Sequence, residues 1–318
     1  MSRETSRGIA PIVLLCEAFG ITRQAYYAAK WRVEAERRGS QNPPTLGSGQ
    51  VEISSPGRSS EARSGAEGRK RVRAAVPAAE LVAGIRRVVE RFPAWGVRKV
   101  WAFLRREGLL VSRKRVWKTM RALGLTLPPV CERGVPLRRG HVAVPESNRR
   151  WATDLTTTWT TRDGWVALVP VIDCGDRFAF DVEVTKSQEA EDVLAPLEKA
   201  LREQFREPEA VPDGLELRSD HGPQYTGADC ERLCERWHVA HTFATVGRPT
   251  GNAVAERFIE TLKVELLWTR DWESLDELRE AVRDWLHSYN YERPHQALDW
   301  KTPAEKREEN LGRERLAA

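Results

Sequence analysis

The spacing of apolar residues divides the chain into helical and extended regions. Between residues 77 and 126, apolar side chains recur every three or four positions in three runs that are interrupted near Gly96 and Gly108. This spacing predicts three amphipathic helices, the last beginning after Ser112, whose hydroxyl suits an N-cap. Because the last helix is rich in arginine and lysine, residues 77–126 are expected to form a helix-turn-helix DNA-binding domain.

A different pattern begins after residue 146, where extended apolar runs replace the helical spacing. Three runs rich in β-branched and aromatic residues are joined by short turns and predict an antiparallel meander over 151–159, 165–174 and 178–184. Helical and extended runs then alternate at 188–205, 215–219, 226–237 and 239–243, before a helix that carries Glu256 and an amphipathic helix over 272–287. This order predicts an α/β domain built on a mixed sheet.

Composition divides the remainder of the chain. Gly20 separates two short helical runs near the N-terminus, an outline shared by helix-turn-helix pairs and by plain helical cores. The next stretch is dominated by Ser, Gly, Pro and Arg, and cannot bury enough apolar surface to become ordered. The expected segments are a helix-turn-helix-like segment (1–38), a flexible linker (39–76), a DNA-binding domain (77–126), a Pro-rich connector (127–146), the α/β core (147–270) and a C-terminal helical block (271–318).

Three acids in the core are candidates for one site. Asp154 lies in the first extended run and Asp220 directly follows the run 215–219; alone, either could be a turn or edge residue. Thirty-five residues separate Asp220 from Glu256, and Lys263 lies seven residues later, two turns along the same helix face. Acids that leave two strands and a helix can converge, and converging carboxylates favour a divalent cation.

This spacing resembles the signature of the retroviral-integrase-like transposases of the DDE superfamily, and within them the B-frame proteins of the IS-three insertion sequences. Asp154, Asp220, Glu256 and Lys263 match that signature, and the resemblance covers roughly residues 77–310, with a looser match in 1–38. It implies a ribonuclease H-like core with a mixed five-stranded sheet. In that fold the first and fourth strands are neighbours, which would bring the two aspartates together.

The resemblance also implies an activity and its cofactors. The family performs metal-dependent cleavage at insertion-sequence ends, followed by strand transfer through attack of the 3′-hydroxyl. Two Mg²⁺ or Mn²⁺ ions would be held by Asp154, as the bridging ligand, with Asp220 and Glu256 each completing one site. The implied partners are the terminal inverted repeats, target DNA, further copies of the chain and an upstream-frame protein to which the active form is fused. The competing functions are a DNA-binding protein without catalysis and a ribonuclease H-like nuclease without strand transfer.

Several basic residues are candidates for DNA contacts. Lys263 suits a phosphate because an ammonium group offers only hydrogen-bond donors, although Glu260 is an alternative partner. The resemblance adds Arg248 and Asn252 from the loop before the Glu256 helix. The basic helix of the DNA-binding domain contributes Arg113, Lys114, Arg115 and Lys118, whereas its Trp117 is expected to belong to the hydrophobic core.

The distribution of charge agrees with a DNA-binding arm joined to an acidic body. The net charge is only +5, but residues 1–150 hold 30 Lys and Arg against 12 Glu, and the remainder holds 21 basic against 34 acidic residues. A solvated basic surface without a partner is the plainer alternative. No apolar run reaches the roughly 20 residues needed to span a bilayer, and the polar start predicts a cytoplasmic protein.

The cysteines raise the question of a zinc site. Five cysteines without dense spacing do not indicate a disulfide scaffold. Cys230, Cys234 and His238 share one helix face, with His241 nearby. Ligands at positions i, i+4 and i+8 of one helix are about 12 Å apart end to end, too far to share one ion. Zinc is therefore not expected.

Overall fold

The computed structural model describes residues 76–127, 144–244 and 252–317. The expected segment 1–38, the expected linker 39–76 except for its last residue, and the candidate DNA contact Arg248 lie outside these residues. Helices α3 (Ala78–Arg91), α4 (Val97–Arg106) and α5 (Arg113–Ala122) form the first described unit. Its core is apolar and includes the fully buried Ile85. As predicted, the Ser112 hydroxyl caps α5 by accepting a hydrogen bond from the backbone N–H of Arg115.

A mixed sheet forms the centre of the second unit. Its strands are β1 (Arg150–Thr153), β2 (Thr156–Thr160), β3 (Gly164–Asp173), β4 (Ala179–Thr185), β5 (Glu216–Ser219) and β6 (Ala240–Phe243). β1 and β2 pair in succession with the same side of β3, so they are one bent strand interrupted at Asp154 and Leu155. β4 pairs with the other side of β3, β1 pairs in parallel with β5, and β5 in parallel with β6. This is the strand order of the ribonuclease H-like fold, and the predicted fold class is confirmed.

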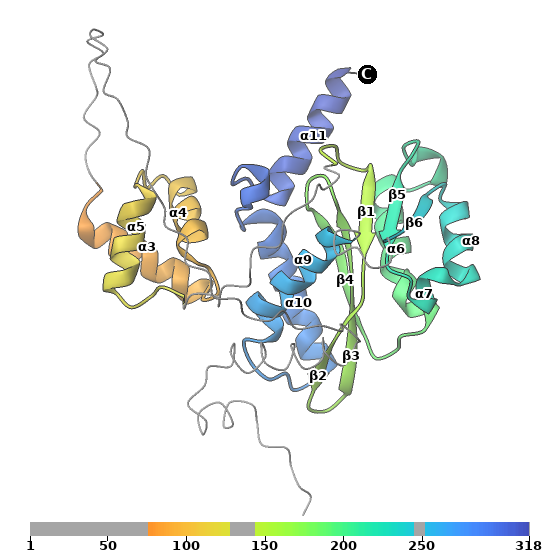
Figure 1. Cartoon of the computed structure of the whole chain (residues 1–318), viewed down its shortest axis with the longest axis horizontal. Coiled ribbons are helices and arrows are strands. Elements are labelled where there is room, and N and C mark those ends of the chain that lie inside the picture. Colours follow the sequence, from red (N-terminus) through yellow and green to blue (C-terminus); the bar gives the residue numbers. More distant parts are fainter. Residues whose placement is uncertain (1–75, 128–143, 245–251, 318) are drawn as a thin grey trace, which may run out of the picture.

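Helices cover both faces of the sheet (Figure 1). The alternation of side chains in β1 sends Trp151 to one face and Ala152 to the other. The Trp151 face packs against α6 (Ala190–Phe205), α7 (Pro223–Thr226) and α8 (Ala228–Arg236). The opposite face packs against α9 (Ala253–Leu262) and α10 (Leu275–Tyr291). Among the residues that the structure describes, no helix is long and apolar enough to cross a membrane.

The last helix, α11 (Pro303–Ala317), is attached to the core by a buried ion pair. Its Arg307 donates to the Asp176 carboxylate at 2.8 Å and lies 3.3 Å from Asp173, and both acids are completely buried. Arg307 also donates to the side chain of Asn148 at 2.9 Å. Burial and the charge of Asp176 raise the pKa of Asp173. The guanidinium therefore compensates two carboxylates that would otherwise be buried with no counter-charge.

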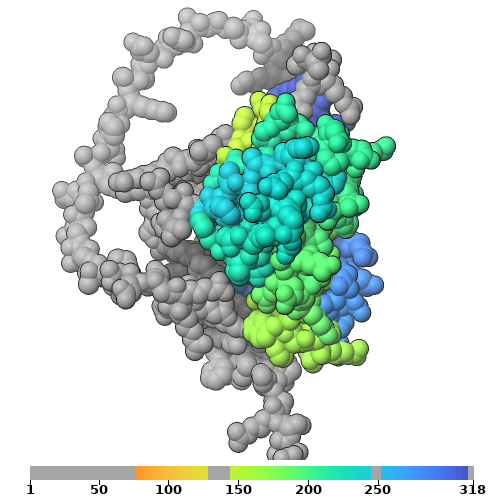
Figure 2. Space-filling view, turned by 90° about the vertical axis from the view of Figure 1, so that its right-hand side faces the viewer, coloured from red at the N-terminus to blue at the C-terminus, as the bar shows by residue number. Residues whose placement is uncertain are grey.

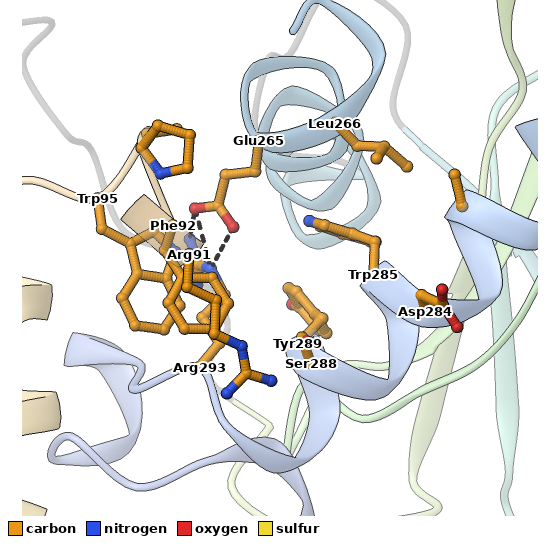
Figure 3. Close-up of a pocket in the computed structure, with 13 residues that line it drawn as sticks. Arg91, Phe92, Trp95, Glu265, Leu266, Asp284, Trp285, Ser288, Tyr289 and Arg293 are labelled. Atoms are coloured by element: carbon orange, nitrogen blue, oxygen red, sulfur yellow. Dashed lines mark hydrogen bonds and ion pairs between the residues drawn. The ribbon is translucent and has the colours of Figure 1, made fainter. Parts of the chain in front are cut away.

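A second ion cluster joins the helical unit to the core, and Figure 3 shows the Glu265–Arg293 pair within it. Glu265 lies in the π-helical turn η2 (Lys263–Leu267) and accepts hydrogen bonds from Lys99 of α4 at 2.6 Å and from Arg293 at 3.0 Å. A cavity of about 320 Å³ adjoins the cluster. Its walls come from both units and include Phe92, Trp95, Trp285 and Tyr289.

Replacement of Arg307 by alanine is expected to lower the free energy of unfolding by about 3–5 kcal/mol, because it leaves buried carboxylates unpaired. Denaturant unfolding followed by circular dichroism measures this change. Arg313→Ala on the same helix is the control, since its ion pair with Glu309 is largely exposed and its removal should change stability by less than about 1 kcal/mol. Equal stability of the two variants would contradict the role given to Arg307.

Candidate active site

The parallel pairing of β1 with β5 sets the positions of the two aspartates. Ala152 pairs with Arg218, so Asp154 and Asp220, each two residues further on, leave the sheet at matching positions. Asp154 occupies the break between β1 and β2, and Asp220 directly follows the end of β5. Both carboxylates are therefore delivered to the same edge of the sheet, as the order of strands predicted.

Helix α9 brings the third acid to this edge. Glu256 lies in the first turn of α9, which packs against β1, and Lys263 follows the end of the helix. The negative charges of Asp220 and Glu256 and the positive charge of Lys263 all act on the Asp154 carboxyl. The four side chains that the sequence singled out thus share one neighbourhood. Glu260, the alternative partner of Lys263, instead pairs with Arg257 at 2.7 Å.

Backbone N–H groups orient the two aspartates. The Leu155 N–H donates to Oδ1 of Asp154 at 2.8 Å, and the Gly222 N–H donates to Oδ1 of Asp220 at 2.9 Å. A Cβ atom at Gly222 would lie 3.0 Å from that same Oδ1 atom, which explains why the smallest residue is favoured here. Each carboxylate keeps its other oxygen available for a cation, as far as the hydrogen bonds of the described residues show.

The electrostatics of the site favour a bound cation. Burial raises the pKa of Asp154 to about 6, and the nearby charges of Asp220 and Glu256 act in the same direction, while the Leu155 N–H and Lys263 oppose them. Burial also raises the pKa of Glu256. A divalent cation would stabilise the ionised forms of all three acids. The ligand set consists of carboxylate oxygens from three separate elements, which suits Mg²⁺ or Mn²⁺ better than a soft metal.

Asn252 has a role that differs from the predicted DNA contact. Its side chain is only 5% exposed, and Nδ2 donates to the Thr153 carbonyl at 2.8 Å. Its backbone carbonyl accepts from the Glu256 N–H at 3.0 Å. The residue therefore links the peptide that precedes Asp154 to the first turn of the Glu256 helix. This buried contact gives Asn252 a structural role, and the DNA contact at Asn252 stays a prediction.

Tyr225 contacts Thr153, the residue before Asp154, and its role was not predicted from the sequence. Its hydroxyl hydrogen bonds with Oγ1 of Thr153 at 3.1 Å, and both side chains are buried. Burial raises the pKa of Tyr225, so the hydroxyl remains protonated. No sequence pattern marks Tyr225 as a neighbour of Thr153. The two residues meet because β1 pairs with β5, and α7 follows β5 in the chain.

The basic residues of α5 differ in their surroundings. The side chain of Arg115 donates to the Val76 carbonyl and is half-buried, which gives it a structural contact. Trp117, expected in the core, is 41% exposed, and the Arg121 guanidinium lies 5.4 Å from the centre of its ring. The exposed members of the predicted set are Arg113, Lys114 and Lys118.

Comparisons with known families and proteins agree with this architecture. Two family models, each described as "Integrase core domain", match residues 144–249 and 234–303, and one described as "HTH-like domain" matches residues 77–130.

Among curated relatives, a protein of insertion element IS407 from Burkholderia multivorans is 29% identical over 66% of this chain and 74% of its own length. The transposase InsD of insertion element IS2 from Escherichia coli is 28% identical over 71% of this chain and 77% of its own length. The catalytic core of BIV integrase is a solved structure with a TM-score of 0.40 and 21% identity, covering 52% of this chain and 98% of that one. These matches confirm the resemblance of the chain to the IS-three family transposases of the DDE superfamily, with an integrase core that follows an HTH-like domain.

Proposed function

We propose that this transposase cuts DNA at the ends of its own insertion sequence and joins the freed 3′-hydroxyl to a target strand. The observation that carries the proposal is the delivery of Asp154 and Asp220 to one sheet edge by paired parallel strands, with Glu256 beside them. A DNA-binding protein without catalysis would have no need to hold three acids together against their mutual repulsion.

The three acids have distinct proposed roles. Asp154 feels the charges of both other acids, and this suits it to bridge two Mg²⁺ or Mn²⁺ ions, while Asp220 and Glu256 each complete one ion's ligands. When bound, such a pair of ions would lower the pKa of the attacking hydroxyl and neutralise charge on the phosphate. Lys263 is positioned at the same edge and would hold a DNA phosphate through its ammonium group. Cleavage and joining would use one site, since both reactions place an oxygen nucleophile in line with a phosphate.

The surface of α5 is the proposed contact with the terminal inverted repeats. Arg113, Lys114 and Lys118 are exposed on this helix, and the exposed ring of Trp117 lies among them. Such a face can neutralise phosphates along a groove edge. We propose further that the active assembly contains several copies of the chain on DNA, together with the upstream-frame protein of the same element.

Alanine in place of Asp154, Asp220 or Glu256 is expected to reduce strand joining below detection while leaving DNA affinity nearly unchanged. Oligonucleotides that carry the element ends, incubated with Mg²⁺, separate three outcomes: joining, cleavage alone and no reaction. Glu260→Ala is the control, because this acid lies on the same helix, is exposed and pairs with Arg257. Joining by a triad variant would refute the proposed site, and cleavage without joining by the unaltered protein would favour a nuclease.

The raised pKa of Asp154 predicts a pH-dependent stability in the absence of metal. The folded protein holds this proton more tightly than the unfolded chain, so the free energy of unfolding should fall as pH rises from about 4 to about 6. The part of this decrease in the free energy of unfolding that is due to Asp154 is at most about 3 kcal/mol. Denaturant titrations in a chelator at several pH values test this, and Asp154→Asn should remove that part of the slope. An unchanged slope in the variant would contradict the assignment.

Removal of the exposed charges of α5 should weaken binding to DNA. Substitution of Arg113, Lys114 or Lys118 by alanine is expected to reduce the salt dependence of binding by about one unit for each phosphate that the side chain had neutralised. Fluorescence anisotropy at several salt concentrations measures the slope. Lys199→Ala is the control, since this exposed lysine lies on α6 of the core and pairs with Asp181. If the α5 variants keep the full slope, the helix does not bind phosphates.

A further inference from the structure

Two cysteines and a histidine meet between α8 and β6. Cys230 and Cys234 lie on adjacent turns of α8 and are both buried, and His241 lies on β6. One ligand atom from each of the three residues lies within 4.8 Å of the others. His238, which the helix spacing offered as the third ligand, is exposed and has a positive φ of 54°. The distance argument against zinc therefore does not apply, because the third ligand comes from the neighbouring strand.

The hydrogen bonds of Ser219 determine which nitrogen of His241 carries its proton. The Ser219 hydroxyl donates to the Asp220 carbonyl at 2.9 Å, and Oγ also lies 2.9 Å from Nε2 of His241. In the tautomer that this arrangement favours, Nε2–H donates to Oγ, because the hydroxyl proton is used at the carbonyl. Nδ1 then has a free lone pair that faces Sγ of Cys230 at 3.7 Å. At metal sites, one ring nitrogen of a histidine commonly binds the ion while the N–H of the other nitrogen donates to a protein group. Nδ1 and Nε2–H of His241 have this arrangement.

The Cys230 sulfur suits the same purpose. The hydrogen bond from Cys234 lowers the pKa of the Cys230 thiol against the effect of burial, and the same hydrogen bond, together with burial, raises the pKa of Cys234. The thiolate is the form that binds metal. In a tetrahedral zinc site, ligand atoms are about 3.5–3.8 Å apart, as follows from Zn–S and Zn–N bonds of about 2.3 and 2.0 Å. The Cys230–His241 distance already has this value, and since all three atoms lie within 4.8 Å of one another, the other separations need to contract by at most about 1 Å.

We propose that Cys230, Cys234 and His241 bind one zinc-like divalent ion, with a fourth position for water. Binding releases the thiol protons to solvent and leaves the ion held by two thiolates and a neutral imidazole. The ion would link α8 to β6, the strand at one side of the sheet; α8 forms part of the face shown in Figure 2. Through His241 and Ser219, it would also stabilise the peptide of Asp220. This site is chemically separate from the carboxylates, because soft sulfur ligands select zinc whereas carboxylate oxygens select magnesium.

The test uses the full chain in a background of Cys16→Ser and Cys131→Ser, since these cysteines lie outside the described residues. With Mg²⁺ in large excess to occupy the carboxylates, Co²⁺ alone is titrated as the spectroscopic probe and retained zinc is measured by mass spectrometry after gel filtration. One ion per chain and a thiolate-to-cobalt charge-transfer band are expected. The band is expected to disappear in Cys230→Ser/Cys234→Ser and to persist in Cys174→Ser, which removes a buried cysteine of another cluster.

Two further results make the outcome decisive. Ser219→Ala keeps all three ligands but removes the group that holds Nε2–H, so the affinity for Co²⁺ should fall about 10- to 100-fold. Absence of the band and of retained zinc in the protein with Cys230, Cys234 and His241 intact would overturn the proposal, whatever the variants do. The same stoichiometry in Cys230→Ser/Cys234→Ser would overturn it as well. Neither measurement depends on DNA cleavage, so the proposed transposition chemistry is tested separately.

Discussion

The parallel hydrogen bonding of β1 with β5 is the constraint on which the active site depends. It brings the residue beyond each strand to the same edge of the sheet, and in this chain both residues are acids. Burial of Asp154 and the nearby charges of Asp220 and Glu256 oppose folding by up to about 3 kcal/mol at neutral pH, as the raised pKa of Asp154 indicates. The pairing also buries Trp151 against Leu217, and each large apolar side chain contributes about 1.5–3 kcal/mol. The burial of apolar side chains therefore outweighs the electrostatic cost at the three acids. A bound cation would attract all three carboxylates and so remove that cost.

The remaining geometry of the site is held by neutral groups. Asn252 connects the Thr153 carbonyl to the first turn of α9, and Tyr225 connects the Thr153 side chain to α7. Neither residue adds a charge, so the acids keep their capacity to bind cations. Thr153 is thus held from two sides immediately before Asp154. Backbone and hydroxyl hydrogen bonds can fix a carboxylate in place without the neutralising effect that an arginine partner would have.

The sequence was informative where the fold imposes a regular pattern. The helices, the strand order and the convergence of Asp154, Asp220 and Glu256 follow from periodicity and from the family signature. Contacts between side chains of distant segments could not be predicted in this way. Asn252 follows a glycine-rich loop that suggested DNA, yet its side chain is buried; Trp117 fits the apolar spacing of α5, yet its ring is 41% exposed. The distance argument against zinc was limited in the same way, because it considered one helix, whereas the three ligand atoms that lie within 4.8 Å of one another include one from His241 on β6.

At Glu265 the neighbouring charges act in the opposite direction from those at Asp154, because they are positive. Here one buried acid has two cations: burial opposes its ionisation, yet Arg293 and Lys99 hold the pKa of Glu265 below its ordinary value. Only Lys99 comes from the helical unit, and Arg293 belongs to the core. If the helical unit separates from the core, Glu265 therefore keeps a partner and Lys99 regains its hydration. The other ion pairs between the two units, Arg91–Glu292 and Arg106–Glu305, are partly exposed, and such pairs contribute about 0–1 kcal/mol each. Separation of the two units would thus leave no uncompensated charge at Glu265, because its pair with Arg293 lies within the core.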